Sequence, residues 1–200
     1  EIPLRLVGSE MCIRDRSWVA IIIIVLIILL LIVGVLQFNR LRRLNVQVDG
    51  AFAGIDTLLT KRADLIPNLV ETVKGAADFE QSTLQAVTDA RASIGQATTV
   101  EETAAADNIL TQALGRLFAV AEAYPQLTAT QNYIELQRQL QQVEGELQFA
   151  RQFYNEAVVL LYTALTTFPG MWFAGVAKVT QRDMYSEPDE DRRDAPSVEF

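Results

Sequence analysis

Two pairs of carboxylates have a spacing that raises the question of acid–base chemistry. Asp78 and Glu80 form one pair, and Glu144 and Glu146 form the other. General acid–base catalysis needs its groups to converge on one substrate. Residues that are two apart on a helix point in different directions. Both pairs therefore predict surface charge rather than a reacting site.

The residue types on which most catalytic and metal sites depend are scarce. The 200 residues contain no histidine and a single cysteine, Cys12. Histidine is the commonest general base and metal ligand, so Ser-His-Asp, Cys-His and histidine-based zinc sites are excluded. No phosphate-binding glycine loop or nucleophile elbow is present. We expect no enzyme activity, catalytic residue, metal site or cofactor. A hydrolase remains an alternative that a deep polar pocket with converging carboxylates would favour.

The charge balance argues against nucleic acid as a partner. The chain has 17 Lys and Arg against 25 Asp and Glu, a formal net charge of -8. Phosphate binding needs clustered basic side chains. Residues 186–200 carry a net charge of -4, half of the total, and contain proline. Segments of this composition are usually solvated, so residues 183–200 predict an acidic disordered tail.

Residues 18–36 form an uncharged run made mostly of Ile, Leu and Val. As a helix the run spans about 29 Å, which matches a bilayer core of about 30 Å. A cleaved signal peptide would have a shorter apolar run and a small-residue cleavage site, so an uncleaved membrane helix over residues 17–38 is favoured. Trp18 fits one membrane interface, and three basic residues follow the other end: Arg40, Arg42 and Arg43. By the positive-inside rule, these arginines place the C-terminal body in the cytoplasm.

Residues 1–16 have a suspect composition. The stretch Met-Cys-Ile-Arg-Asp inside them is what a sequencing-library adapter encodes when it is translated. We interpret residues 1–16 as a sequencing-adapter artefact, the alternative being a genuine disordered tail. No function is therefore assigned to Cys12.

The remainder, residues 39–182, predicts an all-α domain. Apolar residues recur at spacings of three and four, which is the helix signal. Four helices are predicted: residues 39–61, a second that starts near Pro67 and continues to 94, a third opened by a capping box at Thr98 or Thr99, and a fourth opened by a capping box of Thr128 with Gln131. Short connections favour antiparallel neighbours, so the expected fold is an up-down four-helix bundle behind a transmembrane helix.

The last predicted helix carries a heptad seam in which the steps alternate between four and three residues. The seam consists of Leu136, Leu140, Val143, Leu147, Ala150, Tyr154, Ala157, Leu161, Ala164 and Phe168. Pro169 and Gly170 end this helix. The bundle topology returns this end toward the bilayer. Met171, Trp172 and Phe173 then either dip into the membrane interface or, as we favour, close the end of the bundle core.

Residues 61–75, which mix charged and apolar residues at the first predicted turn, hold the most specific motif. Arg62, Asp64 and Asn68 are placed to satisfy free backbone groups at the helix ends, and Glu71 can pair with Lys74. The favoured interpretation is a polar clamp at this corner, and the alternative is a docking surface for a partner. On the fourth helix, Arg151 and Asn155 flank the seam as edge polar groups.

The body resembles the LemA family of bacterial membrane proteins over about residues 38–200. The motifs that carry the resemblance are FNRL, VDGAFAGID, KRADLIPNLVETVKG, TLQAVTDAR, YPQLTATQNYIELQRQL, ARQFYNEAV and PSVEF. The resemblance implies a long antiparallel helical bundle with an N-terminal anchor and no established enzymatic activity. One branch of the family takes part in magnetosome formation, which suggests membrane-organising work. The chain departs from the family pattern at Gly145, at Thr163 and after Pro169.

The matching positions are structural or docking candidates: Arg62, Asp64, Pro67, Asn68, Glu71, Arg151, Tyr154 and Asn155. The membrane-interface candidates are Trp18, Arg40, Arg42, Arg43, Trp172 and Phe173. The expected function is a single-pass scaffold or protein-interaction platform in the bacterial inner membrane. The alternative is a membrane-shaping or envelope-stress protein that contacts lipid directly. A protein partner and association with a second copy are both open, and the bilayer is the partner of the anchor.

Overall fold

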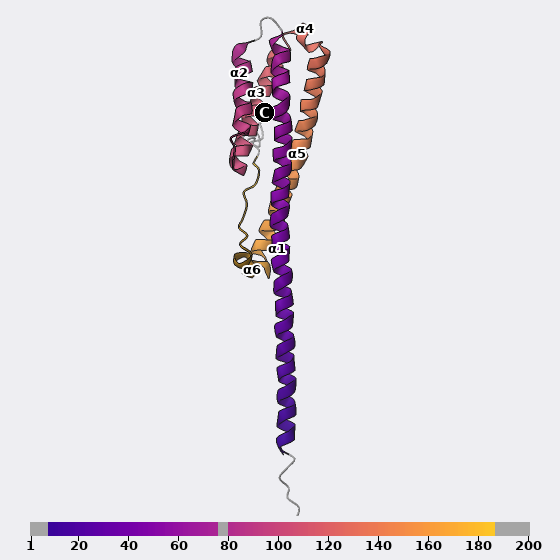
Figure 1. Cartoon of the computed structure of the whole chain (residues 1–200), viewed down its shortest axis with the longest axis vertical. Helices are drawn as coiled ribbons and strands as arrows, with labels where there is room; N and C mark the ends of the chain where they lie inside the picture. Colours follow the sequence, from indigo (N-terminus) through magenta and orange to yellow (C-terminus); the bar gives the residue numbers. More distant parts are fainter. Residues whose placement is uncertain (1–7, 76–79, 187–200) are drawn as a thin grey trace, which may run out of the picture. The chain divides into compact units, whose positions relative to one another are not determined.

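The computed structural model describes residues 8–75 and 80–186, with side chains from Trp18 onward. The described chain is all-helical, as expected. Its helices are α1 (Gly8–Lys74), α2 (Gln81–Ile94), α3 (Val100–Ala121), α4 (Pro125–Thr128), α5 (Gln131–Thr166) and α6 (Gly170–Ala177), as Figure 1 shows. Residues 1–7 of the suspect stretch 1–16 lie outside the described part, and residues 8–16 belong to α1. Residues 76–79, which include Asp78, also lie outside it.

The chain divides into two compact units. The anchor unit comprises residues 1–45 and 163–180, and the body unit comprises residues 46–162 and 181–200. Both α1 and α5 contribute to each unit. All of α6 belongs to the anchor unit, and α2, α3 and α4 belong to the body unit.

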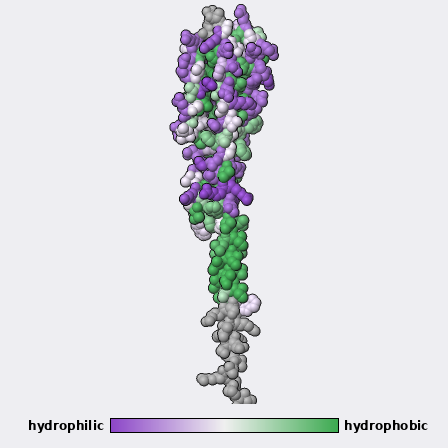
Figure 2. All heavy atoms as spheres, viewed as in Figure 1, coloured by the Kyte–Doolittle hydropathy of each residue, from purple (hydrophilic) through white to green (hydrophobic). Residues whose placement is uncertain are grey.

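The anchor unit contains an apolar helix segment whose side chains are exposed on every side. From Trp18 onward, α1 is long and apolar enough to cross a membrane, and the qualifying window has 0% of its residues buried. This segment is the hydrophobic band of Figure 2. A helix that is apolar all round needs apolar surroundings. The predicted membrane helix is thus supported. Among the described residues, α5 and α6 meet the same criterion only as a pair that is bent by 106°.

The predicted turn between residues 61 and 67 is wrong, because α1 continues through Pro67 to Lys74. A proline inside a helix removes the hydrogen bond to the carbonyl four residues earlier. Here that carbonyl belongs to Ala63, and it accepts a hydrogen bond of 2.9 Å from Nε of Arg91 on α2. The Arg91 side chain therefore replaces the missing backbone donor. The break predicted near Pro67 lies instead between the end of α1 at Lys74 and the start of α2 at Gln81.

One hydrophobic core in the body unit draws side chains from five helices. The helix α1 contributes Ile66, Leu69 and Val73, which continue a buried apolar stripe along the same helix that consists of Leu41, Val48, Ile55 and Leu59. The remaining members come from α2 to α5: Leu84, Val87, Ala90, Leu110, Ala113, Leu114, Leu117, Ala121, Leu127, Tyr133 and Leu140. The stripe is buried on both sides of Pro67, which explains why the helix does not end there.

The start of α3 was correctly predicted from its capping box. The Thr99 side chain accepts a hydrogen bond from the Glu102 amide, and the Glu102 carboxylate accepts one from the Thr99 amide. These bonds satisfy two free amides of the first turn. The second predicted box is wrong, because Thr128 ends the short helix α4 and its hydroxyl donates to backbone carbonyls within that helix. The fourth predicted helix exists as α5, but it starts at Gln131 and not directly after Thr128.

The heptad seam of α5 is buried over most of its length. Leu140, Val143, Leu147, Tyr154, Ala157, Leu161 and Ala164 are all buried. Phe168 does not belong to the seam, because α5 ends at Thr166 and the Phe168 side chain is 66% exposed. Its ring packs edge-on against Trp172 of α6, with 4.6 Å between the ring centroids. The short helix α6 follows at once, where the sequence analysis had predicted the end of a helix but no further helix.

The role of Arg91 can be tested with a double-mutant cycle in the full-length protein. Arg91→Ala should lower the free energy of unfolding by about 1 kcal/mol, because the Ala63 carbonyl loses its donor. In a Pro67→Ala background the amide of residue 67 can supply that donor, so the same change should have almost no effect. Urea unfolding in detergent micelles measures both differences. If Arg91→Ala lowered the free energy of unfolding equally in both backgrounds, Arg91 would not be replacing the backbone donor. The control is Arg116→Ala, a change on the exposed surface of α3.

Candidate functional site

A buried carboxylate of α3 lies at the centre of the body unit's polar contacts. Asp107 is 0% exposed, and both of its oxygens are engaged. Arg62 of α1 donates Nη1 to Oδ1 over 2.9 Å. Arg151 of α5 donates Nη2 to Oδ2. Because a buried charge is stable only when it is paired and hydrogen-bonded, Asp107 fixes the position of both arginines.

Further contacts complete the charge balance around Asp107. Arg62 also donates to the Thr111 hydroxyl over 3.1 Å, and its Nη1 lies 2.9 Å from Oε2 of Glu144. Arg151 donates to Oε1 of the same glutamate over 3.3 Å. Two arginines thus face two carboxylates, so the cluster is neutral. Glu144 was predicted to be a plain surface charge, and this prediction is wrong.

The segment that follows the anchor unit reaches the same cluster. The Tyr185 hydroxyl donates to Oδ2 of Asp107 over 2.8 Å, and its ring lies 5.7 Å from the Arg151 guanidinium. Asn155 forms two hydrogen bonds with the backbone of Tyr185, of 3.0 Å and 2.8 Å. Tyr154 donates to the carbonyl of Asp183 over 2.8 Å. The predicted disordered tail therefore cannot begin at residue 183.

The surroundings of the cluster raise the pKa of two of its members, Tyr185 and Arg151. Burial raises the pKa of the Tyr185 hydroxyl, and the nearby charge of Asp107 raises it further. Burial opposes the charge of Arg151, but the attraction of Asp107 and Glu144 outweighs it and raises the pKa of Arg151. The charged groups pair with one another inside the protein, while Nε of Arg62 is buried without a hydrogen-bond partner. The cluster, which we call the Asp107 clamp, therefore connects three helices and a chain segment rather than holding a substrate.

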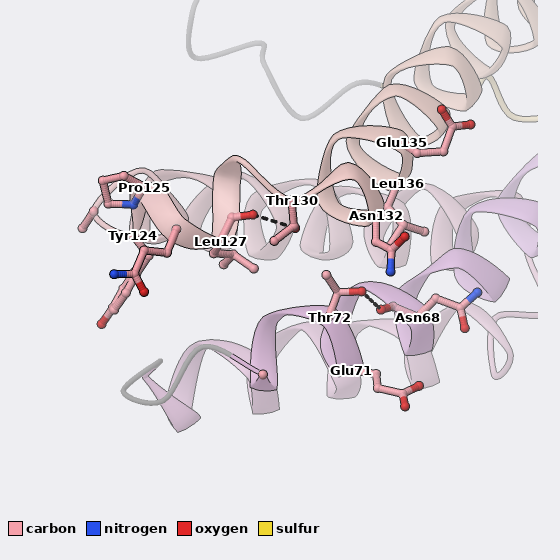
Figure 3. Close-up of a pocket in the computed structure, with 13 residues that line it drawn as sticks. Asn68, Glu71, Thr72, Tyr124, Pro125, Leu127, Thr130, Asn132, Glu135 and Leu136 are labelled. Carbon is pink, nitrogen blue, oxygen red and sulfur yellow. Dashed lines mark hydrogen bonds between the residues drawn. The ribbon is translucent and has the colours of Figure 1, made fainter.

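A groove in the body unit offers the open space that the clamp lacks. It has a volume of about 1120 Å³ and lies between the last turns of α1, the α4 region and the first turns of α5. Figure 3 shows the side chains around it, with Asn132 pointing from α5 toward α1. The lining residues are Asn68, Glu71, Thr72, Gly75, Ala123, Tyr124, Pro125, Gln126, Leu127, Thr130, Asn132, Glu135 and Leu136.

The groove combines acidic and apolar groups. Its charged lining residues are Glu71 on α1 and Glu135 on α5, which lie on opposite sides in Figure 3. Hydrogen bonds from Arg138 and Gln139 lower the pKa of Glu135 to about 2, so this carboxylate is ionised at neutral pH. Tyr124, Leu127 and Leu136 supply apolar surface. The groove therefore offers apolar surface beside two carboxylates, of which Glu135 already pairs with Arg138 over 2.7 Å.

The predicted polar residues divide between these two places. Arg62, Arg151 and Asn155 meet at the Asp107 clamp. Asn68 and Glu71 line the groove instead, and Asp64 is an exposed residue of α1. The corner clamp that was predicted for residues 61–75 does not exist, because no turn occurs there.

Asp107 and Tyr185 were not predicted. Thr103, Asp107, Leu110, Leu114, Leu117 and Ala121 follow the alternating four-three step and are all buried. A carboxylate within an otherwise apolar seam is visible in the sequence, and it indicates a buried charge that needs a partner. Tyr185 lies in a polar, acidic stretch, so its burial has no comparable signal. Among the described residues, no group of three or more His, Cys, Asp or Glu could hold a metal ion.

The predicted interface residues lie in the anchor unit. Trp18, Arg40, Arg42, Arg43 and Trp172 are all exposed. Phe173 is half-buried, and a methyl group at Gly34 would lie only 3.2 Å from its Cε1. The Arg42 guanidinium lies 5.8 Å from the Phe38 ring centroid. The basic residues therefore follow directly after the apolar part of α1.

The fold and these sites define a class: an all-helical protein with an apolar N-terminal helix that is suited to a single membrane crossing. The sequence model of the LemA family matches residues 51–200, and the chain belongs to this family. The comparison with curated proteins returned no match.

Removing the central carboxylate should destabilise the body unit strongly. We expect Asp107→Ala to lower the free energy of unfolding by about 3–5 kcal/mol, because Arg62 and Arg151 remain buried without it. Thermal and urea unfolding of the full chain in micelles measure the effect. Asp89→Ala, at an exposed position of α2, should change stability by no more than about 0.5 kcal/mol. A small effect at Asp107 would show that the clamp contributes little.

The raised pKa of Tyr185 predicts a loss of stability at high pH. Its folded pKa lies above the ordinary value of 10.0, so the folded state keeps the proton longer than the unfolded state. The resulting stabilisation is complete below the ordinary value and declines as pH rises above it. Tyr185→Phe should therefore show a smaller fall in the free energy of unfolding between about pH 9 and about pH 11. Tyr133 and Tyr154 are present in both proteins, so any difference in the pH dependence of the free energy of unfolding comes from Tyr185. The same pH dependence in both proteins would contradict the Tyr185–Asp107 contact.

Proposed function

We propose that the protein is a non-enzymatic scaffold that is held in the bacterial inner membrane and binds a protein segment in the groove of Figure 3. The groove is the observation that carries this proposal. Its volume of about 1120 Å³ lies above the range of about 300–1000 Å³ that is typical of small-molecule sites. A groove of this volume has room for a short polypeptide segment.

The chemistry of the lining indicates which segment would bind. Glu71 and Glu135 favour a lysine or arginine, while Leu127 and Leu136 favour an apolar side chain. Asn132 and Thr130 offer polar groups for a peptide backbone. The expected partner is therefore a basic, partly apolar segment of another protein.

The arrangement of the helices supports a scaffold role. We infer that the body-unit parts of α1, α2, α3 and α5 form the up-down four-helix bundle that their short connections favour. The Asp107 clamp then makes this bundle a rigid frame for the groove. The arginines at positions 40, 42 and 43 support a single-pass orientation with the body in the cytoplasm.

The absence of a catalytic role is part of the proposal. Asp107 has both carboxylate oxygens engaged, so it cannot accept a substrate proton without breaking the clamp. Hydrogen bonds keep Glu135 ionised, which disfavours it as a general acid. The alternative, a membrane-shaping or envelope-stress protein that contacts lipid directly, is favoured by the exposed apolar side chains of α6.

Site-specific photo-crosslinking in native membranes tests the groove. A benzophenone amino acid at Asn132 should capture a protein whose crosslinked peptide carries a Lys or Arg, whereas the same probe at the exposed Gln141 of α5 should not. The charge reversals Glu71→Lys and Glu135→Lys together should remove at least about 90% of the adduct, because like charges repel a basic segment.

Three results would contradict the groove proposal. One is the same adducts from Asn132 and Gln141, and another is adducts that persist after both charge reversals. The third is an adduct of twice the chain mass alone, which would identify a second copy instead of another protein.

A further inference from the structure

The outward face of α6 is apolar, which is the reverse of a helix on a water-facing surface. Gly170 and Ala177 are the buried residues of this helix. Phe168, Met171, Trp172 and Val176 are exposed by between 45% and 70%. A surface helix normally turns its polar side outward. Adjacent exposed apolar side chains of this size mark an interaction surface rather than chance exposure.

The helix α6 adjoins the apolar part of α1 within the anchor unit. The Phe173 ring lies so close to Gly34 that a methyl group there would be 3.2 Å from Cε1. Gly34 lies in the uncharged run of residues 18–36. In Figure 2, hydrophobic residues at the position of α6 adjoin the hydrophobic band of α1. The apolar surface of α1 is therefore continuous with the outward apolar face of α6.

Charge in the anchor unit is distributed as it is at a membrane interface. No charged residue occurs from residue 163 to residue 177, and Lys178 follows immediately. The exposed Arg40, Arg42 and Arg43 lie in the same unit. Basic side chains beside Trp and Phe are the usual composition of segments that bind anionic lipid headgroups.

The position of α6 is fixed by close backbone packing. A methyl group at Gly170 would lie within 2.1 Å of the Ala164 carbonyl oxygen, so only glycine fits the start of the helix. The helix α6 turns away from α5 by 106°. Lys178 ends it with a left-handed backbone, and the Val179 amide bonds back to the Ala174 carbonyl over 3.3 Å. The apolar face therefore has a fixed direction.

We propose that α6 is an interfacial membrane helix, whose outward face of Phe168, Met171, Trp172 and Val176 inserts among lipids at the headgroup–acyl boundary. The occupant of this face is lipid rather than a protein, because the face continues the surface of the transmembrane segment and is bordered by basic residues. The chain then contacts one leaflet through two elements, the span of α1 and the in-plane helix α6. This inference is independent of the groove.

Trp172 gives a direct readout in the full-length protein. Trp18→Phe leaves Trp172 as the single tryptophan of the chain. This variant is reconstituted in vesicles of phosphatidylcholine and phosphatidylglycerol that carry bromine at known acyl-chain depths. Shallow bromines should quench the emission at least about twofold, and more than bromines near the bilayer centre, because interfacial helices lie about 5–10 Å into the boundary.

A matched control places a tryptophan probe on an exposed position of α5 instead of α6. In a Trp18→Phe, Trp172→Phe background, Phe149→Trp puts the probe at a position of α5 that is 75% exposed. It precedes the end of α5 by about 25 Å at about 1.5 Å per residue. This probe should be quenched by aqueous acrylamide and not by bromolipid. Val176→Trp in the same background provides a second probe on α6 and should behave as Trp172 does.

Two outcomes would overturn the proposal. Emission from Trp172 and from Val176→Trp that acrylamide quenches and bromolipid does not would place α6 in water. Blue-shifted emission that neither agent quenches would mean that protein covers the face, either another part of this chain or a second copy. Correct insertion of α1 in each variant is checked separately by protease protection, so a failed reconstitution is recognised before quenching is read.

Discussion

The body unit depends on one buried carboxylate. Asp107 can be buried and charged only because two arginines and a tyrosine come to it from α1, α5 and the segment after α6. Each partner lies far from Asp107 in the sequence. The need of this one carboxylate for partners therefore specifies several long-range contacts. Leucine seams specify that helices pack together, but they tolerate small shifts along the helix axis. A hydrogen-bonded charge does not, so the Asp107 clamp defines the register of α1 against α3 and α5.

Apolar periodicity predicted the helical character of the chain and the buried faces of its long helices, but it missed the short helices α4 and α6. The seam of α5 and the capping box of Thr99 with Glu102 occur where the sequence places them. The prediction failed at Pro67, where a local rule indicates a helix start. Tertiary contacts decided otherwise, since the apolar stripe continues through the proline and Arg91 supplies the missing donor. That donor comes from another helix, and no local rule contains it.

The candidate sites were predictable to different degrees. Arg62 was selected as a polar residue at a predicted turn and Arg151 as a polar residue beside an apolar seam. Their common partner, Asp107, lies in a helix that was interpreted only for its apolar residues. Asn68 and Glu71 were chosen for a turn that does not exist, and they line a groove whose other wall is about 60 residues away in the chain. The helix α6 was recognised only as an apolar stretch. Its outward face depends on the tight backbone contact at Gly170, which composition cannot reveal.

The replacement of a backbone donor by Arg91 has an evolutionary consequence. The acceptor is a main-chain carbonyl, which every residue type at position 63 would offer equally. Position 63 is therefore free to vary with respect to this contact, while positions 67 and 91 are coupled. A chain that loses the proline gains its own amide donor and has no further need of an arginine on α2. Related sequences should thus retain or lose these two residues together, although they are separated in the chain.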